Sequence, residues 1–276
     1  GVHRNFQKNE LRAVDAAALQ RVADLVDEDG SDEHVLGHRR EDAVDDDLAR
    51  PLGLVAEDIP VIEAGEAAGE VFGRVVDRAT AVEVSETGGI RSLHIGSDTV
   101  QSSMKVADPV ELVLSYTRAM MGFLLFHREP RHFVMIGLGG GSLAKYAYHH
   151  HPAARVTSVE NNPEVIAVAR SMFAVPQDDA RFTVISGDGG AWVAEHPASC
   201  DVLMVDAYDS KAQVEELATE DFYTQARDAL EPDGVLVVNL WSTDPRFDVF
   251  LQRVERAFEG LVICLPAERK GNVAVF

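Results

Sequence analysis

From residue 133 onward, the sequence alternates short β-branched runs with helical segments, and this alternation limits the possible folds more than any other feature. Apolar runs typical of strands occupy residues 133–137, 156–159, 182–185, 202–205 and 235–240. Helical segments separate them, near residues 142–150, 163–172, 189–195, 219–230 and 245–258. Continuous apolar strands that alternate with helices form parallel sheets covered by helices on both faces. The sequence therefore predicts a doubly wound α/β fold.

Further strands are expected at both ends of this region. Residues 261–265 and 273–276 have no helix between them, which favours an antiparallel hairpin at the sheet edge and brings the mostly parallel sheet to seven strands. Residues 81–95 are typical of a small N-terminal β-hairpin around the Gly88-Gly89 turn. Asp108-Pro109 predicts the start of a helix that continues through Phe126, because proline is favoured in the first helical turn.

The first 78 residues differ in composition from the rest. No Phe, Trp or Tyr occurs between Phe6 and Phe72, and residues 24–58 are dominated by acids. So little bulky apolar surface does not offset the entropy that is lost on ordering the chain. We therefore expect an acidic, low-aromatic and poorly ordered extension over residues 1–78. The folded domain over residues 79–276 then divides into a hairpin and helix (79–131) and a nucleotide-binding α/β core (132–276).

The composition disfavours several classes of function. The chain has 46 acidic and 25 basic residues, a formal net charge of −21. Nucleic acids and anionic membrane surfaces both require clustered Lys and Arg, so we expect neither as a partner. The most apolar stretch, residues 110–126, contains Glu111 and Arg118 and is too short to span a bilayer. Two cysteines, Cys200 and Cys264, are too few for a disulfide framework, and we expect two buried thiols and a cytoplasmic location.

A glycine-rich turn follows the first strand of the predicted core. Gly137, Gly139 and Gly141 allow a tight turn and the close approach of a ligand to the backbone, beside the positive end of the next helix. Glu160 ends the second strand, 21 residues after Gly139 (160 − 139 = 21). An acid at about this spacing is placed to bind ribose hydroxyls, although a solvated strand-end glutamate is the plain alternative.

Three more acids follow the third and fourth predicted strands. Asp188 and the following Gly189 are placed to contact an adenine ring, but Asp188 is equally suited to capping the next helix. Asp206 and Asp209 follow the fourth strand, at the edge where ligands bind in open α/β sheets. Acids are common in loops, so this pair alone leaves a solvated role open.

Together these motifs resemble those of the spermidine synthase (polyamine aminopropyltransferase) family. The residues that carry the resemblance are Gly137-Leu138-Gly139-Gly140-Gly141, Val159-Glu160, Gly187-Asp188-Gly189, Asp206-x-x-Asp209, Phe222-Tyr223 and Leu230-Glu231-Pro232-Asp233-Gly234, with Gln101 and Tyr116 upstream. The resemblance covers about residues 80–276. It implies the Rossmann-like fold of class I S-adenosylmethionine-dependent methyltransferases.

The resemblance also implies a reaction and a role for each motif. The cofactor would be decarboxylated S-adenosylmethionine, and its aminopropyl group would pass to a small-molecule amine such as putrescine without a metal. Glu160 would hold the ribose, Asp188 would hold the adenine, and Gln101 would lie near the cofactor. Asp206 would be the general base, and Asp209 would bind the cationic end of the diamine. A homodimer is a further implication.

Two other functions stay open on the sequence alone. A methyltransferase that uses ordinary S-adenosylmethionine would share the sheet and the glycine turn. A non-catalytic cofactor-binding or scaffold protein would keep the fold without turnover, and the segment 210–216 favours it because it departs from the family pattern. Adjacent histidines on one helix point in different directions, so the run 149–151 is not expected to bind metal.

Overall fold

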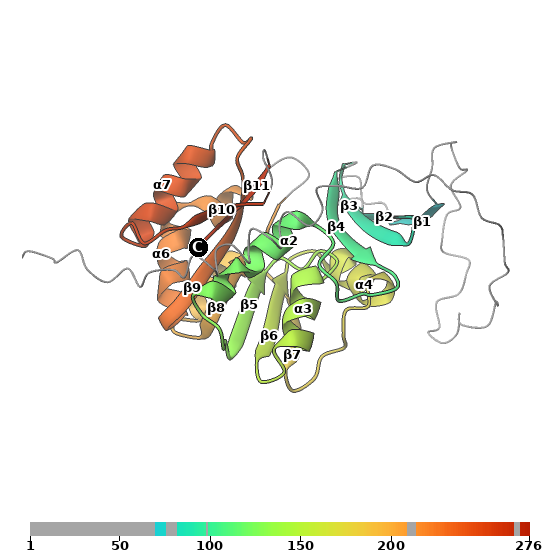
Figure 1. The fold of residues 1–276 in the computed structure, drawn as a ribbon, viewed down its shortest axis with the longest axis horizontal. Helices are drawn as coiled ribbons and strands as arrows, with labels where there is room; N and C mark the ends of the chain where they lie inside the picture. The colour runs from blue at the N-terminus through green and yellow to red at the C-terminus, as the bar shows by residue number, and fades with distance from the viewer. Residues whose placement is uncertain (1–69, 76–81, 98, 209–213, 268–270) are drawn as a thin grey trace, which may run out of the picture.

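The computed structural model describes residues 70–75, 82–97, 99–208, 214–267 and 271–276 of the chain (Figure 1). These residues form two sheets, a larger one covered by helices and a smaller antiparallel one beside it. The predicted extension lies largely in residues 1–69, outside the described residues, and it stays a prediction.

The larger sheet contains seven strands within the described ranges, in the order β10-β11-β9-β8-β5-β6-β7. Their bounds are His132–Ile136 (β5), Arg155–Glu160 (β6), Phe182–Ser186 (β7), Cys200–Val205 (β8), Leu230–Trp241 (β9), Cys264–Pro266 (β10) and Asn272–Val275 (β11). The strands β9, β8, β5, β6 and β7 run parallel, whereas β10 and β11 pair antiparallel at one edge. The predicted seven-stranded, mostly parallel sheet with an antiparallel edge hairpin is confirmed.

Helices cover both faces of this sheet, as a doubly wound fold requires (Figure 1). Their bounds are Ser142–His150 (α3), Pro163–Met172 (α4), Gly189–Glu195 (α5), Glu220–Ala229 (α6) and Phe247–Ala257 (α7). Val134 and Ile136 of β5 pack in one cluster with side chains of α5, α6 and α7. Phe133 and Met135 point to the other face, where they pack with side chains of α3. Successive residues of a strand face opposite sides, so an uninterrupted apolar strand fills both layers.

The smaller sheet contains the predicted hairpin and extends it on both sides. Its strands are Glu70–Val75 (β1), Val82–Thr87 (β2), Ile90–Ile95 (β3) and Val100–Lys105 (β4), each antiparallel to its neighbour. Gly88 and Gly89 form the turn with φ of 61° and 78°. β1 lies within residues 1–78, and the boundary between the extension and the folded domain stays a prediction.

One predicted helix begins later than expected. The helix expected from Asp108-Pro109 to Phe126 is observed as α2 (Ser115–Met120) followed by a 3-10 helix, η1 (Met121–Leu125). The Asp108 carboxylate accepts a hydrogen bond from the Val110 amide (3.3 Å), and this local bond favours a turn over a helical start. Among the described residues, none of the helices has both the length and the apolarity to cross a membrane.

The two cysteines differ in environment. Cys200 is buried at the start of β8, whereas Cys264 is exposed on β10. The expectation of two buried thiols is therefore wrong for Cys264, because β10 is the outermost strand of the sheet.

Candidate active site

A cavity of about 750 Å³ opens at the carboxyl ends of β5, β6, β7 and β8. Each predicted strand-end motif reaches it, and β4 and α2 close it from the side of the smaller sheet. The predicted site residues in its lining are Gln101, Gly137, Gly139, Glu160, Asp188, Gly189 and Asp206. Gly141 lies outside the lining, as the N-cap of α3. Asp209 lies outside the described residues.

The glycine turn has a conformation that other residues rarely adopt. Gly137, Gly139 and Gly141 have φ of 96°, 52° and 70°. A Cβ at Gly137 would collide with the backbone carbonyl of Asp206. The turn that precedes α3 and the strand end that carries Asp206 are therefore packed against each other, and only glycine fits between them.

The Glu160 carboxylate is held by backbone amides on two sides. Its Oε2 accepts a hydrogen bond from the Leu138 amide (2.9 Å), and its Oε1 accepts one from the Asn162 amide (2.9 Å). The side chain therefore joins the glycine turn to the start of α4 while it lines the cavity. Each carboxylate oxygen has a second lone pair that is available to a ligand hydroxyl.

Asp188 caps α5, which confirms the capping role that the sequence left open. Its Oδ1 accepts a hydrogen bond from the Ala191 amide (2.7 Å). The side chain is exposed and also lines the cavity. A Cβ at Gly189 would collide with Ile136, so the close packing of the start of α5 against the end of β5 requires glycine here. Contact with adenine stays a prediction.

Asp206 follows β8 directly and is half-buried in the acidic lining. Its Oδ1 accepts a hydrogen bond from Asn239 Nδ2 (2.9 Å), and Tyr116 of α2 provides a second hydrogen bond. Burial raises the pKa of this carboxyl above its ordinary value, while the bonds from Asn239 and Tyr116 oppose the rise. The Tyr116 hydroxyl has one proton, so its 3.3 Å hydrogen bond to the Gln101 carbonyl competes with its bond to Asp206. A carboxylate in such a setting is suited to accept a proton.

The charge of the cavity has a single sign. The described lining contains four acidic side chains and no Lys, Arg or His. The acids are Glu160, Asp188, Asp206 and Glu216. With no basic side chain in the described part of the lining, these carboxylates favour a cationic ligand over an anionic one.

Asn239 and Tyr208 are site residues that the sequence analysis did not single out. Tyr208 lines the cavity, stacks on Trp241 with ring centroids 4.8 Å apart, and donates a hydrogen bond to the Asn239 carbonyl (2.8 Å). Trp241 is not among the described residues that line the cavity. One available signal was Asn239 itself, a polar residue within the apolar run of a central strand, since buried polar groups require partners.

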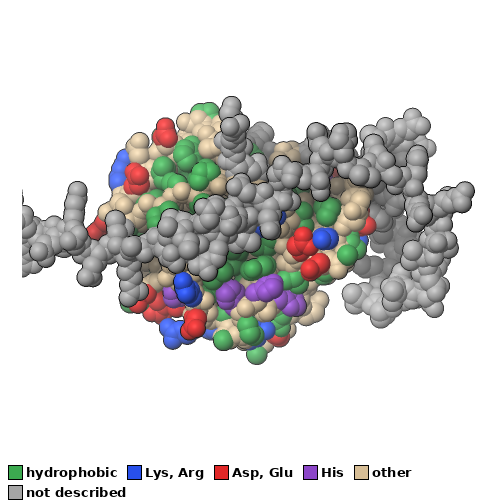
Figure 2. All heavy atoms as spheres, viewed as in Figure 1, with side chains coloured by type: hydrophobic (Ala, Val, Ile, Leu, Met, Phe, Trp, Pro, Cys, Tyr) green, Lys and Arg blue, Asp and Glu red, His purple; other side chains and the backbone are tan. Residues whose placement is uncertain are grey.

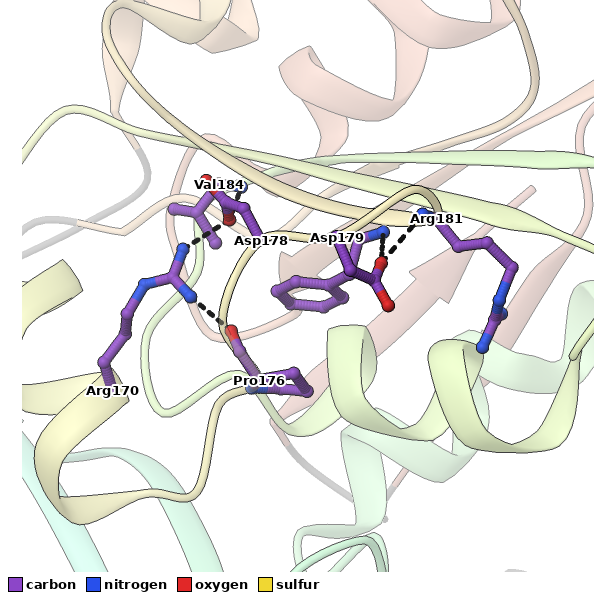
Figure 3. A network of polar contacts seen from close by, with 7 residues as sticks. Arg170, Pro176, Asp178, Asp179, Arg181 and Val184 are labelled. Carbon is purple, nitrogen blue, oxygen red and sulfur yellow. Dashed lines mark hydrogen bonds and ion pairs between the residues drawn. The ribbon is translucent and has the colours of Figure 1, made fainter.

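The loop between α4 and β7 supports the glycine turn from outside. A Cβ at Gly141 would collide with Val175 of this loop. Arg170 holds the loop through hydrogen bonds to the Pro176 carbonyl and to the Asp178 carboxylate, the latter at 2.5 Å (Figure 3). The position of the turn therefore depends on contacts made well outside the cavity.

The aromatic and histidine residues of α3 lie away from the cavity. The Tyr146 and His150 rings contact each other in a tilted arrangement with centroids 4.2 Å apart, and the Tyr148 hydroxyl donates a hydrogen bond to Asp179 (2.6 Å). Histidine side chains gather on the face of the molecule shown in Figure 2, in the region where Figure 1 places α3. The described residues contain no group of three or more His, Cys, Asp or Glu side chains that could hold a metal ion.

The sequence matches known proteins over most of this fold. Residues 113–261 match the profile of the Spermine/spermidine synthase domain. The chain belongs to this family. A polyamine aminopropyltransferase of Chromobacterium violaceum is 48% identical over 200 residues, which cover 72% of this chain and 77% of the relative. One from Neisseria meningitidis is 48% identical over 195 residues, covering 70% and 74%. The predicted family resemblance is confirmed.

Solved structures agree on the fold of this family member. A probable spermidine synthase from Corynebacterium glutamicum superposes with a TM-score of 0.64 at 20% identity, over 76% of this chain and 80% of that protein. A spermidine synthase in complex with the transition-state analogue AdoDATO has a TM-score of 0.57 at 20% identity, over 74% and 72%. At this identity the likeness supports the fold alone.

Proposed function

We propose that this protein is a spermidine synthase-like aminopropyltransferase, which moves an aminopropyl group from decarboxylated S-adenosylmethionine to an amine such as putrescine. The observation that carries the proposal is the hydrogen-bonded Asp206 carboxylate in a cavity whose described lining has no basic side chain. Both reactants are cations, a sulfonium and an ammonium, so an acidic lining suits both. The two relatives at 48% identity bear the name polyamine aminopropyltransferase, which supports the same reaction.

The glycine turn and the strand-end acids fit the nucleoside part of such a cofactor. Gly137 and Gly139 line the cavity without a side chain, so a ligand can approach their backbone closely. We assign Glu160 to the ribose hydroxyls, because its oxygens are already fixed by two backbone amides. Asp188 is assigned to the adenine amino group, and Gln101 to the side of the cavity formed by β4. When bound, the sulfonium makes its neighbouring carbon electrophilic and supplies a good leaving group.

Asp206 is assigned as the general base. An alkylamine is mostly protonated at neutral pH and must lose a proton before its nitrogen can attack. Asp206 takes this proton, the amine nitrogen forms a bond to the aminopropyl carbon, and the carbon–sulfur bond breaks with its electron pair passing to sulfur. Asp209 is assigned to the distant ammonium of the diamine; it lies outside the described residues, and this role is a prediction from the sequence. A cytoplasmic location and a homodimer likewise remain predictions.

Substitution Asp206→Asn tests this assignment. The amide is isosteric and can still accept from Asn239, but it cannot take a proton. We expect kcat to fall by at least about a hundredfold, with unchanged affinity for decarboxylated S-adenosylmethionine in calorimetric titration. Asp248→Asn, an exposed change on α7, is the matched control and should keep full activity.

Calorimetry on the unaltered protein tests the cofactor itself. Decarboxylated S-adenosylmethionine should bind more tightly than S-adenosylmethionine, since the acidic lining disfavours the extra carboxylate. Tighter binding of the carboxylated form would favour a methyltransferase. Binding of neither would overturn the proposal.

A further inference from the structure

A chain of side-chain amides leads from the antiparallel edge of the sheet to Asp206. Asn272 on β11 donates from Nδ2 to Asn239 Oδ1 (3.0 Å), and Asn239 on β9 donates from Nδ2 to Asp206 Oδ1 (2.9 Å). Asn272 lies opposite Trp241 and Ala274 lies opposite Asn239, so the two asparagines are diagonal neighbours on adjacent antiparallel strands. Such neighbours share one face of the sheet and are within reach of each other.

The direction of these hydrogen bonds matters because a side-chain amide can exchange the positions of its NH₂ group and its oxygen. A primary amide has an NH₂ group that donates and an oxygen that accepts. If the Asn239 amide turned over, its oxygen would face the Asp206 carboxylate and repel it. Asn272 opposes this, because the turn would break its hydrogen bond from Nδ2 to the Asn239 oxygen unless both amides turned together. Asn239 is 2% exposed, so water has little access to compensate for the loss of either bond.

We propose that Asn272 is a positioning residue for the general base: it fixes the Asn239 amide so that a donor always faces Asp206 and keeps this carboxylate ionised before the amine binds. The inference rests on the proposed function, which makes Asp206 the base. It places a determinant of catalysis on β11, outside the described lining of the cavity.

The tyrosines next to Asp206 do not titrate in the pH range in which Asp206 does. Tyr116 from α2 and Tyr208 from the loop after β8 surround it, and burial raises the pKa of both phenols. Both therefore remain neutral in the acid range. Tyr223 of α6 and Asp244 act on Tyr208 rather than on Asp206 directly. Glu160, Asp188 and Glu216 also line the cavity, but among these acids the side-chain amides of Asn239 and Asn272 lead to Asp206 alone, so a change in the acid limb between the Asn272 variants and the unaltered protein reports on Asp206.

The test is the pH dependence of kcat/KM for Asn272→Ala in the full chain, with decarboxylated S-adenosylmethionine and putrescine as substrates. Loss of the Asn272 donor frees the Asn239 amide and removes the fixed hydrogen bond to the carboxylate, which raises the pKa of the base. The acid limb should therefore move to higher pH by about one unit. At a pH on this limb, kcat/KM of the variant should then be about tenfold lower than that of the unaltered protein. Ionisation of putrescine is the same for every variant and cancels in the comparison.

Two further variants separate positioning from a structural role. Ser242→Ala removes the hydrogen bond from the Ser242 hydroxyl to the Gly271 carbonyl (2.9 Å) beside Asn272, and should leave the acid limb in place. Asn272→Asp is isosteric and covers the case in which Asn272→Ala does not fold. Its carboxylate can only accept, so the Asn239 amide turns toward it and the limb again moves to higher pH.

Each outcome decides between two separate ideas. An acid limb that moves in the Asn272 variants and not in Ser242→Ala supports the inference. An unchanged limb in a folded, active Asn272 variant overturns it and leaves the proposed function intact. Absence of aminopropyl transfer in the unaltered protein overturns the proposed function itself, and the inference with it.

Discussion

At the scale of single residues, the glycine turn owes its shape to two separate effects, an unusual backbone angle and the lack of space for a side chain. Gly137 shows both, with φ of 96° and the Asp206 carbonyl where a Cβ would lie. Gly89 shows only the first, with φ of 78° and nothing within 4 Å of a Cβ. Substitution at Gly89 therefore measures backbone strain alone, whereas substitution at Gly137 measures strain and steric collision together.

We predict that Gly137→Ala costs much more stability than Gly89→Ala. The change at Gly89 should cost about 1 kcal/mol of unfolding free energy, the strain of an L-residue at positive φ. The change at Gly137 should cost at least about 3 kcal/mol, because the backbone of Asp206 must also move. Urea unfolding of both variants measures the difference. Equal losses would mean that the contact with Asp206 does not constrain the turn.

Residue patterns were sufficient to place the strand-end groups in one cavity. Gly137, Glu160, Asp188 and Asp206 each lie at or just after the end of a strand, and parallel strands bring their carboxyl ends to one edge. The sequence did not reveal Asn239, whose role depends on a hydrogen bond between strands that no spacing along the chain encodes. Hydrogen-bond partners on neighbouring strands, such as Asn239 and Asp206, are set by the order of strands in the sheet, which only the structure shows.

At the scale of elements, α3 and α4 are joined by a buried amine. Lys145 of α3 is 1% exposed, and its Nζ donates to the carbonyl of Phe173, the C-cap of α4 (2.7 Å). A cation suits the negative end of a helix dipole. Burial nevertheless lowers the pKa of Lys145 from 10.5 to about 8, since desolvation disfavours the charged form.

This environment predicts a dependence of stability on alkaline pH. Between pH 8 and 10.5 the unfolded chain binds more protons at Lys145 than the folded chain, so the free energy of unfolding rises with pH across this window. The rise should amount to about 3 kcal/mol, from a shift of about 2.5 pH units. Lys145→Met should abolish it, which urea unfolding of both proteins at a series of pH values would measure.

Lys105→Met provides the opposite sign as a control. A hydrogen bond and charge attraction from Glu111 raise the pKa of this exposed lysine. Its contribution to stability is therefore present below the ordinary lysine pKa and is lost as pH rises through the folded value. A Lys145→Met variant whose stability still rises like that of the unaltered protein would show that the rise does not come from Lys145.

Elements with strong periodicity were predicted well, and those defined by local bonds or by pairing were not. The core helices and parallel strands agree with the structure because uninterrupted apolar runs leave little choice of layer. β4 (Val100–Lys105) was missed, since its polar sequence becomes a strand only by pairing with β3. α2 starts late because Asp108 bonds locally, and tertiary or local contacts of this kind override the intrinsic preference of the sequence.

At the scale of the whole molecule, charge acts on the approach of the substrate. The chain has a formal net charge of −21, and the described lining of the cavity adds four carboxylates without a base. A net negative charge together with an acidic cavity attracts a cationic amine before contact and raises its local concentration. Dissolved salt screens this attraction, since the Debye length falls from about 30 Å at 0.01 M to about 3 Å at 1 M.

We therefore predict that kcat/KM for putrescine falls as salt increases, by roughly tenfold between 10 mM and 500 mM NaCl. The value of kcat at saturating amine should change much less, because bound substrate no longer depends on long-range attraction. A monoamine acceptor of similar length is the matched control, since half the charge should give a shallower slope on the same protein. Sucrose at equal osmolality tests for effects of crowding and viscosity without screening. Equal slopes for the diamine and the monoamine would contradict the prediction, because an attraction that does not scale with the charge of the ligand is not electrostatic.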